Sequence, residues 1–101
     1  MNVKFEIGED TVVVFLEGEL DHHNVKDLRE QIDAVINRAK PKLTVLDLSK
    51  VPFSDSSGIA VVLGRYKLVN AMGGRVEVRN ANPQVKKLLS FGGVSRLVTI
   101  I

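Results

Sequence analysis

The sequence predicts an α/β fold in which a mixed, mostly parallel sheet of about five strands has helices packed against it. Three observations carry this prediction. Apolar and polar residues alternate over residues 3–7, which is the period of a half-buried strand. Residues 43–48 are nearly all apolar, as in a strand that is buried on both faces. Between these segments, apolar residues recur at helical spacing. We therefore expect the element order ββαβαβαβ, with parallel βαβ units.

The first part of the chain is expected to form a hairpin and a helix. Residues 3–7 and the β-branched run at 11–16 flank Gly8-Glu9-Asp10, so they pair as antiparallel strands. Asp21 is the expected N-cap of the helix that follows, and Pro41 ends that helix. Its buried stripe consists of Val25, Leu28, Ile32, Val35, Ile36 and Ala39.

The second part of the chain continues with three strands and two helices. The apolar strand leads through a serine-rich turn into a helix, with Ser57 as its expected N-cap and Gly73-Gly74 at its end. A short strand at 76–78 follows, and Asn82-Pro83 opens the last helix with a cap and a first-turn proline. Residues 97–101 are the last strand. The inward residues of these two helices are Ile59, Val62, Leu63, Tyr66, Val69, Met72, Val85, Leu88 and Leu89.

The composition is that of one folded domain over residues 1–101, and it argues against several classes of function. The chain is 45% hydrophobic and 26% charged, with a net charge of +2 and no run of Lys and Arg longer than a pair. Nucleic-acid and membrane binding are therefore not expected. The absence of cysteine excludes disulfides and thiolate chemistry. Because no signal peptide or apolar stretch of ~20 residues is evident, we expect a cytoplasmic protein. We also expect no cofactor.

The candidate functional site is Phe53-Ser54-Asp55-Ser56-Ser57-Gly58, which links the buried strand to the next helix. A serine at this rim of the sheet is accessible to a kinase, and a phosphate adds about −1.5 to −2 charges. The Gly-x-Ser-x-Gly turn of serine hydrolases is absent, because Ser54 and Asp55 occupy the place of its first glycine. Capping by Ser57 leaves Ser56 unexplained. From the residues alone, a cap and a phosphorylation switch at Ser56 both remain open.

Asp21-His22-His23 is a second candidate, because it contains the only two histidines. A metal site needs three or four ligands, and adjacent histidines on a helix start point in different directions. A triad of Ser56, His22 and Asp21 lacks an evident oxyanion hole. Capping and surface recognition are the preferred interpretation, with Glu19, Asp21 and Asp55 at one acidic rim.

Gly64-Arg65-Tyr66-Lys67 is a third candidate. We expect Arg65 and Lys67 to face solvent and Tyr66 to point inward. The pair is either ordinary helix surface or a docking strip for an acidic partner or nucleotide phosphates. A mid-helix glycine costs about 1 kcal/mol relative to alanine, so Gly64 indicates close approach by another backbone.

Four segments together resemble the anti-sigma factor antagonists of bacteria, the STAS-domain family, and most of all its sporulation branch, which acts on anti-sigma F factors. The segments are Gly18-Glu19-Leu20-Asp21-His22-His23, Val45-Leu46-Asp47-Leu48, Phe53-Ser54-Asp55-Ser56-Ser57-Gly58 and Leu63-Gly64-Arg65-Tyr66-Lys67. The resemblance covers the whole chain and implies a STAS fold with a non-enzymatic partner switch. In such a switch, the unphosphorylated protein binds an anti-sigma factor that is also a serine kinase, and the sigma factor is released.

The same resemblance implies roles for single residues. The kinase uses ATP to phosphorylate Ser56, which ends binding, and a serine phosphatase restores the first state. Asp21 matches the family aspartate near this serine, and Ser57 matches the helix-capping serine. The expected partner surface consists of Asp21, Asp55, Ser56, Ser57, Gly58 and Arg65. Two alternatives remain: an antagonist in a general-stress sigma pathway, and a module that binds a nucleotide or small anion.

Overall fold

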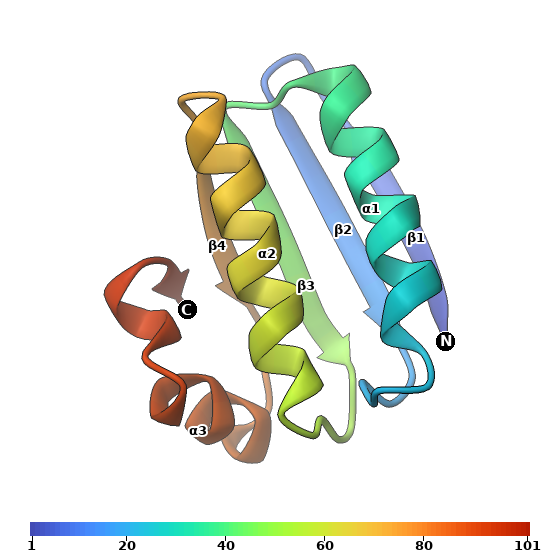
Figure 1. Cartoon of the computed structure of the whole chain (residues 1–101), viewed down its shortest axis with the longest axis vertical. Coiled ribbons are helices and arrows are strands. Elements are labelled where there is room, and N and C mark those ends of the chain that lie inside the picture. The colour runs from blue at the N-terminus through green and yellow to red at the C-terminus, as the bar shows by residue number, and fades with distance from the viewer.

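The computed structural model describes residues 1–101 and contains one five-stranded mixed sheet, whose strands are ordered as they occur in the chain (Figure 1). The first two strands pair antiparallel and every later neighbour pairs parallel, so the predicted α/β class and element order are confirmed. The strands are β1 (Asn2–Ile7), β2 (Thr11–Glu17), β3 (Leu43–Lys50), β4 (Arg75–Arg79) and β5 (Thr99–Ile100).

Three helices cover one face of this sheet. α1 and α2 lie side by side across it, and α3 packs near the beginning of α2 (Figure 1). Because side chains alternate along a strand, Val12, Val14 and Leu16 of β2 all turn toward the helices and are buried. None of the helices has the length and apolar composition that a bilayer crossing requires. The helices are α1 (Val25–Ala39), α2 (Ser57–Ala71) and α3 (Pro83–Phe91).

The helix α1 begins four residues later than its predicted cap. Asp21 is not the N-cap, a position that Asn24 occupies. Instead, the Oδ1 atom of Asp21 accepts hydrogen bonds from the amides of His23 (2.9 Å) and Asn24 (3.2 Å). Asp21 therefore holds a turn that precedes the helix, and the expectation that it caps α1 is wrong.

The end of the chain also differs from the prediction. A 3-10 helix, η1 (Val94–Arg96), precedes β5, which is only two residues long. This turn buries Val94 and Val98 and leaves Leu97 half exposed, so the strand predicted at 97–101 is shorter. The opening of α3 follows the prediction, because Oδ1 of Asn82 accepts from the Val85 amide at 2.9 Å.

The face of the sheet opposite the helices carries buried charges. Glu77 of β4 lies between Arg75 (3.1 Å) and Arg79 (2.8 Å) and is only 7% exposed. On β3, Asp47 lies opposite Arg79 and accepts from the Ser49 amide (2.9 Å) and from Asn80 Nδ2 (3.0 Å). Although burial opposes ionisation of Asp47, these hydrogen bonds hold the pKa of its carboxyl below the ordinary value.

Candidate functional site

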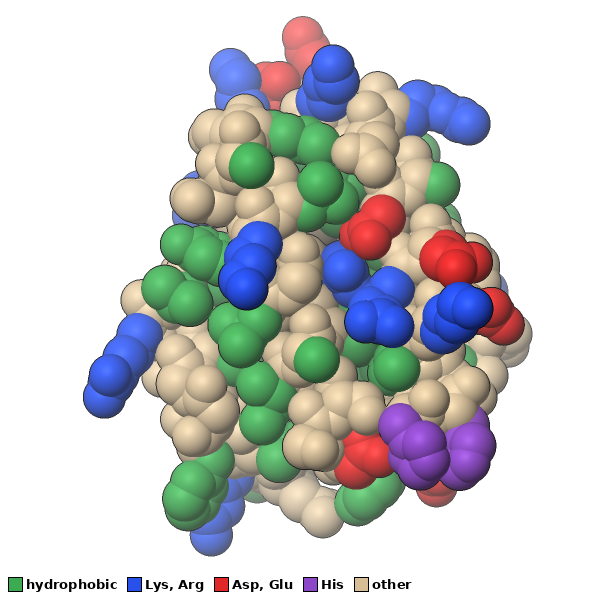
Figure 2. Space-filling view, in the orientation of Figure 1, with side chains coloured by type: hydrophobic (Ala, Val, Ile, Leu, Met, Phe, Trp, Pro, Cys, Tyr) green, Lys and Arg blue, Asp and Glu red, His purple; other side chains and the backbone are tan.

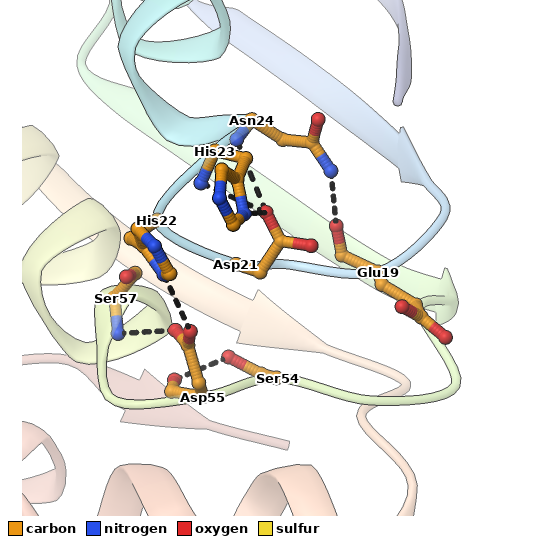
Figure 3. Close-up of polar contacts among 8 residues, drawn as sticks. All are labelled: Glu19, Asp21, His22, His23, Asn24, Ser54, Asp55 and Ser57. Carbon is orange, nitrogen blue, oxygen red and sulfur yellow. Dashed lines mark hydrogen bonds and ion pairs between the residues drawn. The ribbon is translucent and has the colours of Figure 1, made fainter.

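The site is built where two neighbouring parallel strands end at the same edge of the sheet. The segments that follow β2 and β3 are joined through their backbones at the buried residue Leu20. Its amide donates to the Phe53 carbonyl (3.0 Å), and its carbonyl accepts from the Asp55 amide (2.9 Å). This pairing brings Asp21 toward Asp55, while Glu19, on the other side of Leu20, lies farther along the same edge (Figure 3). We call these three carboxylates the acidic rim.

Ser56 lies at the N-cap position of α2, where its side chain is exposed. Its hydroxyl makes no capping hydrogen bond. The expected position of this serine, at a helix N-terminus on the rim, therefore agrees with the structure. Chemically, the site offers a free hydroxyl that a phosphoryl donor can reach from solvent.

Capping of α2 is performed by Asp55 and not by Ser57, which corrects the prediction. Ser57 is already the first helical residue, and its amide donates to Oδ1 of Asp55 at 2.8 Å (Figure 3). The Ser57 amide, and after it the Ser57 hydroxyl, hold the pKa of the Asp55 carboxyl below its ordinary value. Asp55 is therefore an anion that already occupies a free amide of the helix N-terminus.

The two histidines lie on the solvent side of this corner. Nδ1 of His22 lies 3.7 Å from Oδ2 of Asp55, and Nδ1 of His23 lies 3.8 Å from Oδ1 of Asp21 (Figure 3). Both imidazole rings are largely exposed. Since His22 faces Asp55 and Asp21 faces His23, the structure does not arrange Ser56, His22 and Asp21 as a catalytic triad.

Gly58 and Ser54 are buried beneath the turn between β3 and α2 and hold its shape. Ser54 is buried, and its hydroxyl donates to the Asp55 carbonyl at 2.8 Å. A methyl group on Gly58 would overlap Oγ of Ser54, so only glycine lets the first turn of α2 pack this close. Sequence reasoning assigned Ser54 no structural role, because nothing in the sequence shows which serine of the run is buried.

Asn82 is a second residue whose role the sequence showed only in part. Besides capping α3, its Nδ2 donates to the carbonyls of Val51 (3.3 Å) and Pro52 (3.1 Å). One side chain thus ties the beginning of α3 to the segment that leads into the site.

Arg65 is buried, and the expectation that it faces solvent is wrong. Its side chain is 7% exposed and joins α2 to α1 through Asp33, with Nε 2.7 Å from Oδ1. Nη2 donates to Oδ2 at 3.3 Å. Burial lowers the pKa of the guanidinium, and the charge of Asp33 opposes that effect. Lys67 is exposed and Tyr66 is half-buried against the core, as expected.

No other segment of the chain packs closely against Gly64. No atom lies within 4 Å of the place where its Cβ would be. The inferred close approach is therefore absent from the chain itself, and the α2 surface is open at this point.

An apolar surface borders the serine on the side of α3. Phe53 is 41% exposed and Phe91 is 83% exposed. Ile59, in the first turn of α2, packs directly against Gly92 at the end of α3. Figure 2 shows hydrophobic side chains gathered over α2 and the α2–α3 boundary. Large apolar groups exposed beside a polar rim are typical of protein interaction sites.

Known proteins resemble this chain over nearly its whole length. The STAS domain family matches residues 2–101. An anti-sigma F factor antagonist of Paenibacillus polymyxa is 40% identical over 100 residues, which cover 99% of this chain and 86% of the relative. Another, of Lysinibacillus sphaericus, is 38% identical over 88 residues, covering 87% and 75%. The structure of the anti-sigma factor antagonist SpoIIAA in its unphosphorylated form superimposes with a TM-score of 0.85 at 33% identity, covering 99% of this chain and 88% of that one. The chain belongs to the STAS domain family.

Proposed function

We propose that this chain is an anti-sigma factor antagonist of the sporulation type, a regulatory binding protein and not an enzyme. The observation that carries the proposal is the free, exposed hydroxyl of Ser56 beside an exposed apolar surface. Its similarity to two anti-sigma F factor antagonists supports this proposal. The partner is an anti-sigma factor with serine kinase activity, so the chain acts in the cytoplasm, where sigma factors control transcription.

The unphosphorylated form binds this partner through the corner that carries Ser56. Phe53 and Phe91 supply apolar contact area, and the acidic rim with Ser57 completes the surface, while Gly58 is buried beneath it. Occupation of the anti-sigma factor frees the sigma factor. Interfaces of this kind have a dry apolar centre, in which an added charge without a partner is costly.

Phosphorylation of Ser56 by the kinase, with ATP as donor, ends this binding through charge. Asp55 already holds the Ser57 amide, so a phosphate on Ser56 gains little from the helix N-terminus. It adds about −1.5 to −2 charges next to the carboxylate of Asp55 and the rest of the acidic rim. The phosphate therefore stays on the surface and repels the partner without unfolding the helix. A serine phosphatase restores the binding form.

The test is intact-mass spectrometry of the chain after incubation with its cognate anti-sigma kinase and ATP. We expect one added phosphate on the wild type and none on Ser56→Ala, which keeps its affinity for the kinase. Ser56→Asp should bind far more weakly than the wild type. If the wild type gains no phosphate from a kinase of demonstrated activity, or if Ser56→Asp binds like the wild type, the switch is refuted.

A nucleotide- or anion-binding module is the less favoured function. That function needs open amides at the beginning of α2, and the carboxylate of Asp55 occupies one of them. It also needs Arg65 and Lys67 on one exposed strip, whereas Arg65 is buried against Asp33. Calorimetric titration with ATP and GTP should therefore show no binding.

A further inference from the structure

A charged groove lies between α1 and α2, away from the phosphorylation site. It has a volume of about 260 Å³ and contains no hydrophobic lining residue. Figure 2 shows the basic and acidic side chains gathered over the α1–α2 boundary, on the opposite side of α2 from the hydrophobic surface. The residues that line it, which we call the α1–α2 groove, are Lys26, Arg29, Glu30, Asp33 and Arg65.

The groove contains a cationic donor that the chain leaves unsatisfied. Nη1 of Arg65 is buried and has no hydrogen-bond partner. Nε lies close to Oδ1 of Asp33, but its N–H is not directed at that oxygen. Asp33 therefore satisfies only part of the Arg65 guanidinium, and the Arg65 side chain as a whole is 7% exposed. Buried donors in folded proteins normally have partners, so an oxygen from outside the chain is expected here.

The charges around this donor favour an anionic group. Three cations and two carboxylates line the groove, which leaves a net charge of +1, and Lys26 and Arg29 are both exposed at its mouth. The acidic rim has the opposite sign. A guanidinium and neighbouring cations form short, charge-assisted hydrogen bonds with carboxylates. The missing side chain of Gly64, next to Arg65, keeps the adjoining surface of α2 open to an approaching chain.

We infer that the α1–α2 groove is a second contact for the anti-sigma kinase and binds an aspartate or glutamate side chain of that partner. The inference rests on the proposed function. Arg65 is nine residues from Ser56 along α2, a distance of about 14 Å at the rise of an α-helix. An interface of ordinary size covers about 800 Å² on each partner and spans both points. Opposite charges at the two ends of the contact then fix the orientation of the kinase on α2.

The experiment compares two charge reversals on the same exposed helix. Lys26→Glu/Arg29→Glu reverses the mouth of the groove, and Arg38→Glu with Lys40→Glu reverses two exposed basic residues in the last turn and at the C-cap of α1. Affinity of each full chain, unphosphorylated, for the cognate kinase is measured by calorimetry at low and raised ionic strength. We expect the groove variant to bind at least about tenfold more weakly, with a smaller salt dependence, and the control to stay within about twofold of wild type.

The outcomes separate this inference from the proposed function. If the groove variant and the control bind the kinase with equal affinity, the inference is overturned. The proposed function still stands in that case, provided that the wild type binds the kinase and accepts phosphate on Ser56. A wild type that does not bind the kinase overturns both. Circular dichroism of each variant identifies a loss of folding, and in that case the single variant Arg29→Glu provides the same comparison against Arg38→Glu.

Discussion

Two glycines of α2 provide a matched test of the structure, because the same substitution should have opposite effects on stability. At Gly64 a methyl group enters open space, with no atom within 4 Å. Gly64→Ala should therefore show the helix propensity difference alone, a stabilisation of about 0.8–1.0 kcal/mol. In a domain of this size, a change of that magnitude raises the melting temperature by roughly 4–8 °C.

At Gly58 the methyl group meets Ser54, which is buried and bonded to the Asp55 carbonyl. Displacing that hydroxyl removes a hydrogen bond with a net value of about 1 kcal/mol. Overpacking adds about 1–3 kcal/mol, and the propensity gain in the first turn offsets less than 1 kcal/mol. We expect Gly58→Ala to lower the free energy of unfolding by about 1–3 kcal/mol.

Equilibrium urea unfolding measures both effects, provided that the m-value is unchanged. The urea midpoint should rise for Gly64→Ala and fall for Gly58→Ala. A decrease for Gly64→Ala would refute the open surface of α2. A Gly58→Ala protein as stable as wild type would refute the close packing of α2 on Ser54.

Three further variants test the capping, the buried acid and the loop anchor. Asp55→Ala should lower the urea midpoint more than Ser57→Ala does, because Asp55 supplies the cap; the reverse order would contradict this assignment. The lowered pKa of Asp47 in the folded state contributes stability above the unfolded value of 3.8, and this contribution is lost as pH falls through the folded pKa. Asp47→Asn should therefore flatten the decrease in stability below about pH 4, measured by urea unfolding at several pH values; an unchanged slope would contradict it. Asn82→Ala should cost about 1–3 kcal/mol in thermal unfolding, because it removes a cap and two bonds to the preceding loop; a melting temperature like that of wild type would show that these bonds contribute nothing.

The sequence predicted all three α-helices and the order of the five strands along the chain, because the periodic segments are long and the turn residues between them are clear. The predicted inward residues of α2 do pack in or against the core, but the sequence missed that Val61 and Arg65 are buried as well. Residues 59–63 are all apolar, so periodicity cannot decide which side of this helix is buried. The fully buried side includes Val61, Val62, Arg65 and Val69, about one residue around from the predicted stripe, and Arg65 was therefore expected in solvent.

The position of the serine run between β3 and the beginning of α2 was predicted correctly, but the capping roles of its residues were not. Asp55, Ser56 and Ser57 are all acceptable N-caps, and only the backbone conformation decides which side chain reaches the free amides. The second task of Asn82 depends on a contact across 30 residues of sequence. That contact has no local signal, since Asn82-Pro83 is already explained by the beginning of α3.

The backbone pairing at Leu20 has a consequence for how Ser56 is recognised. The segment before the serine is fixed on both sides by hydrogen bonds to Leu20, and the serine then enters a helix. A kinase that acts on Ser56 therefore meets a folded corner built from two distant parts of the chain, and not an extended peptide. A short peptide with the sequence of residues 53–58 lacks this shape and should be a poor substrate. Modification at Ser56 would then mark only molecules that have completed folding, so that incompletely folded copies neither bind the partner nor consume its ATP.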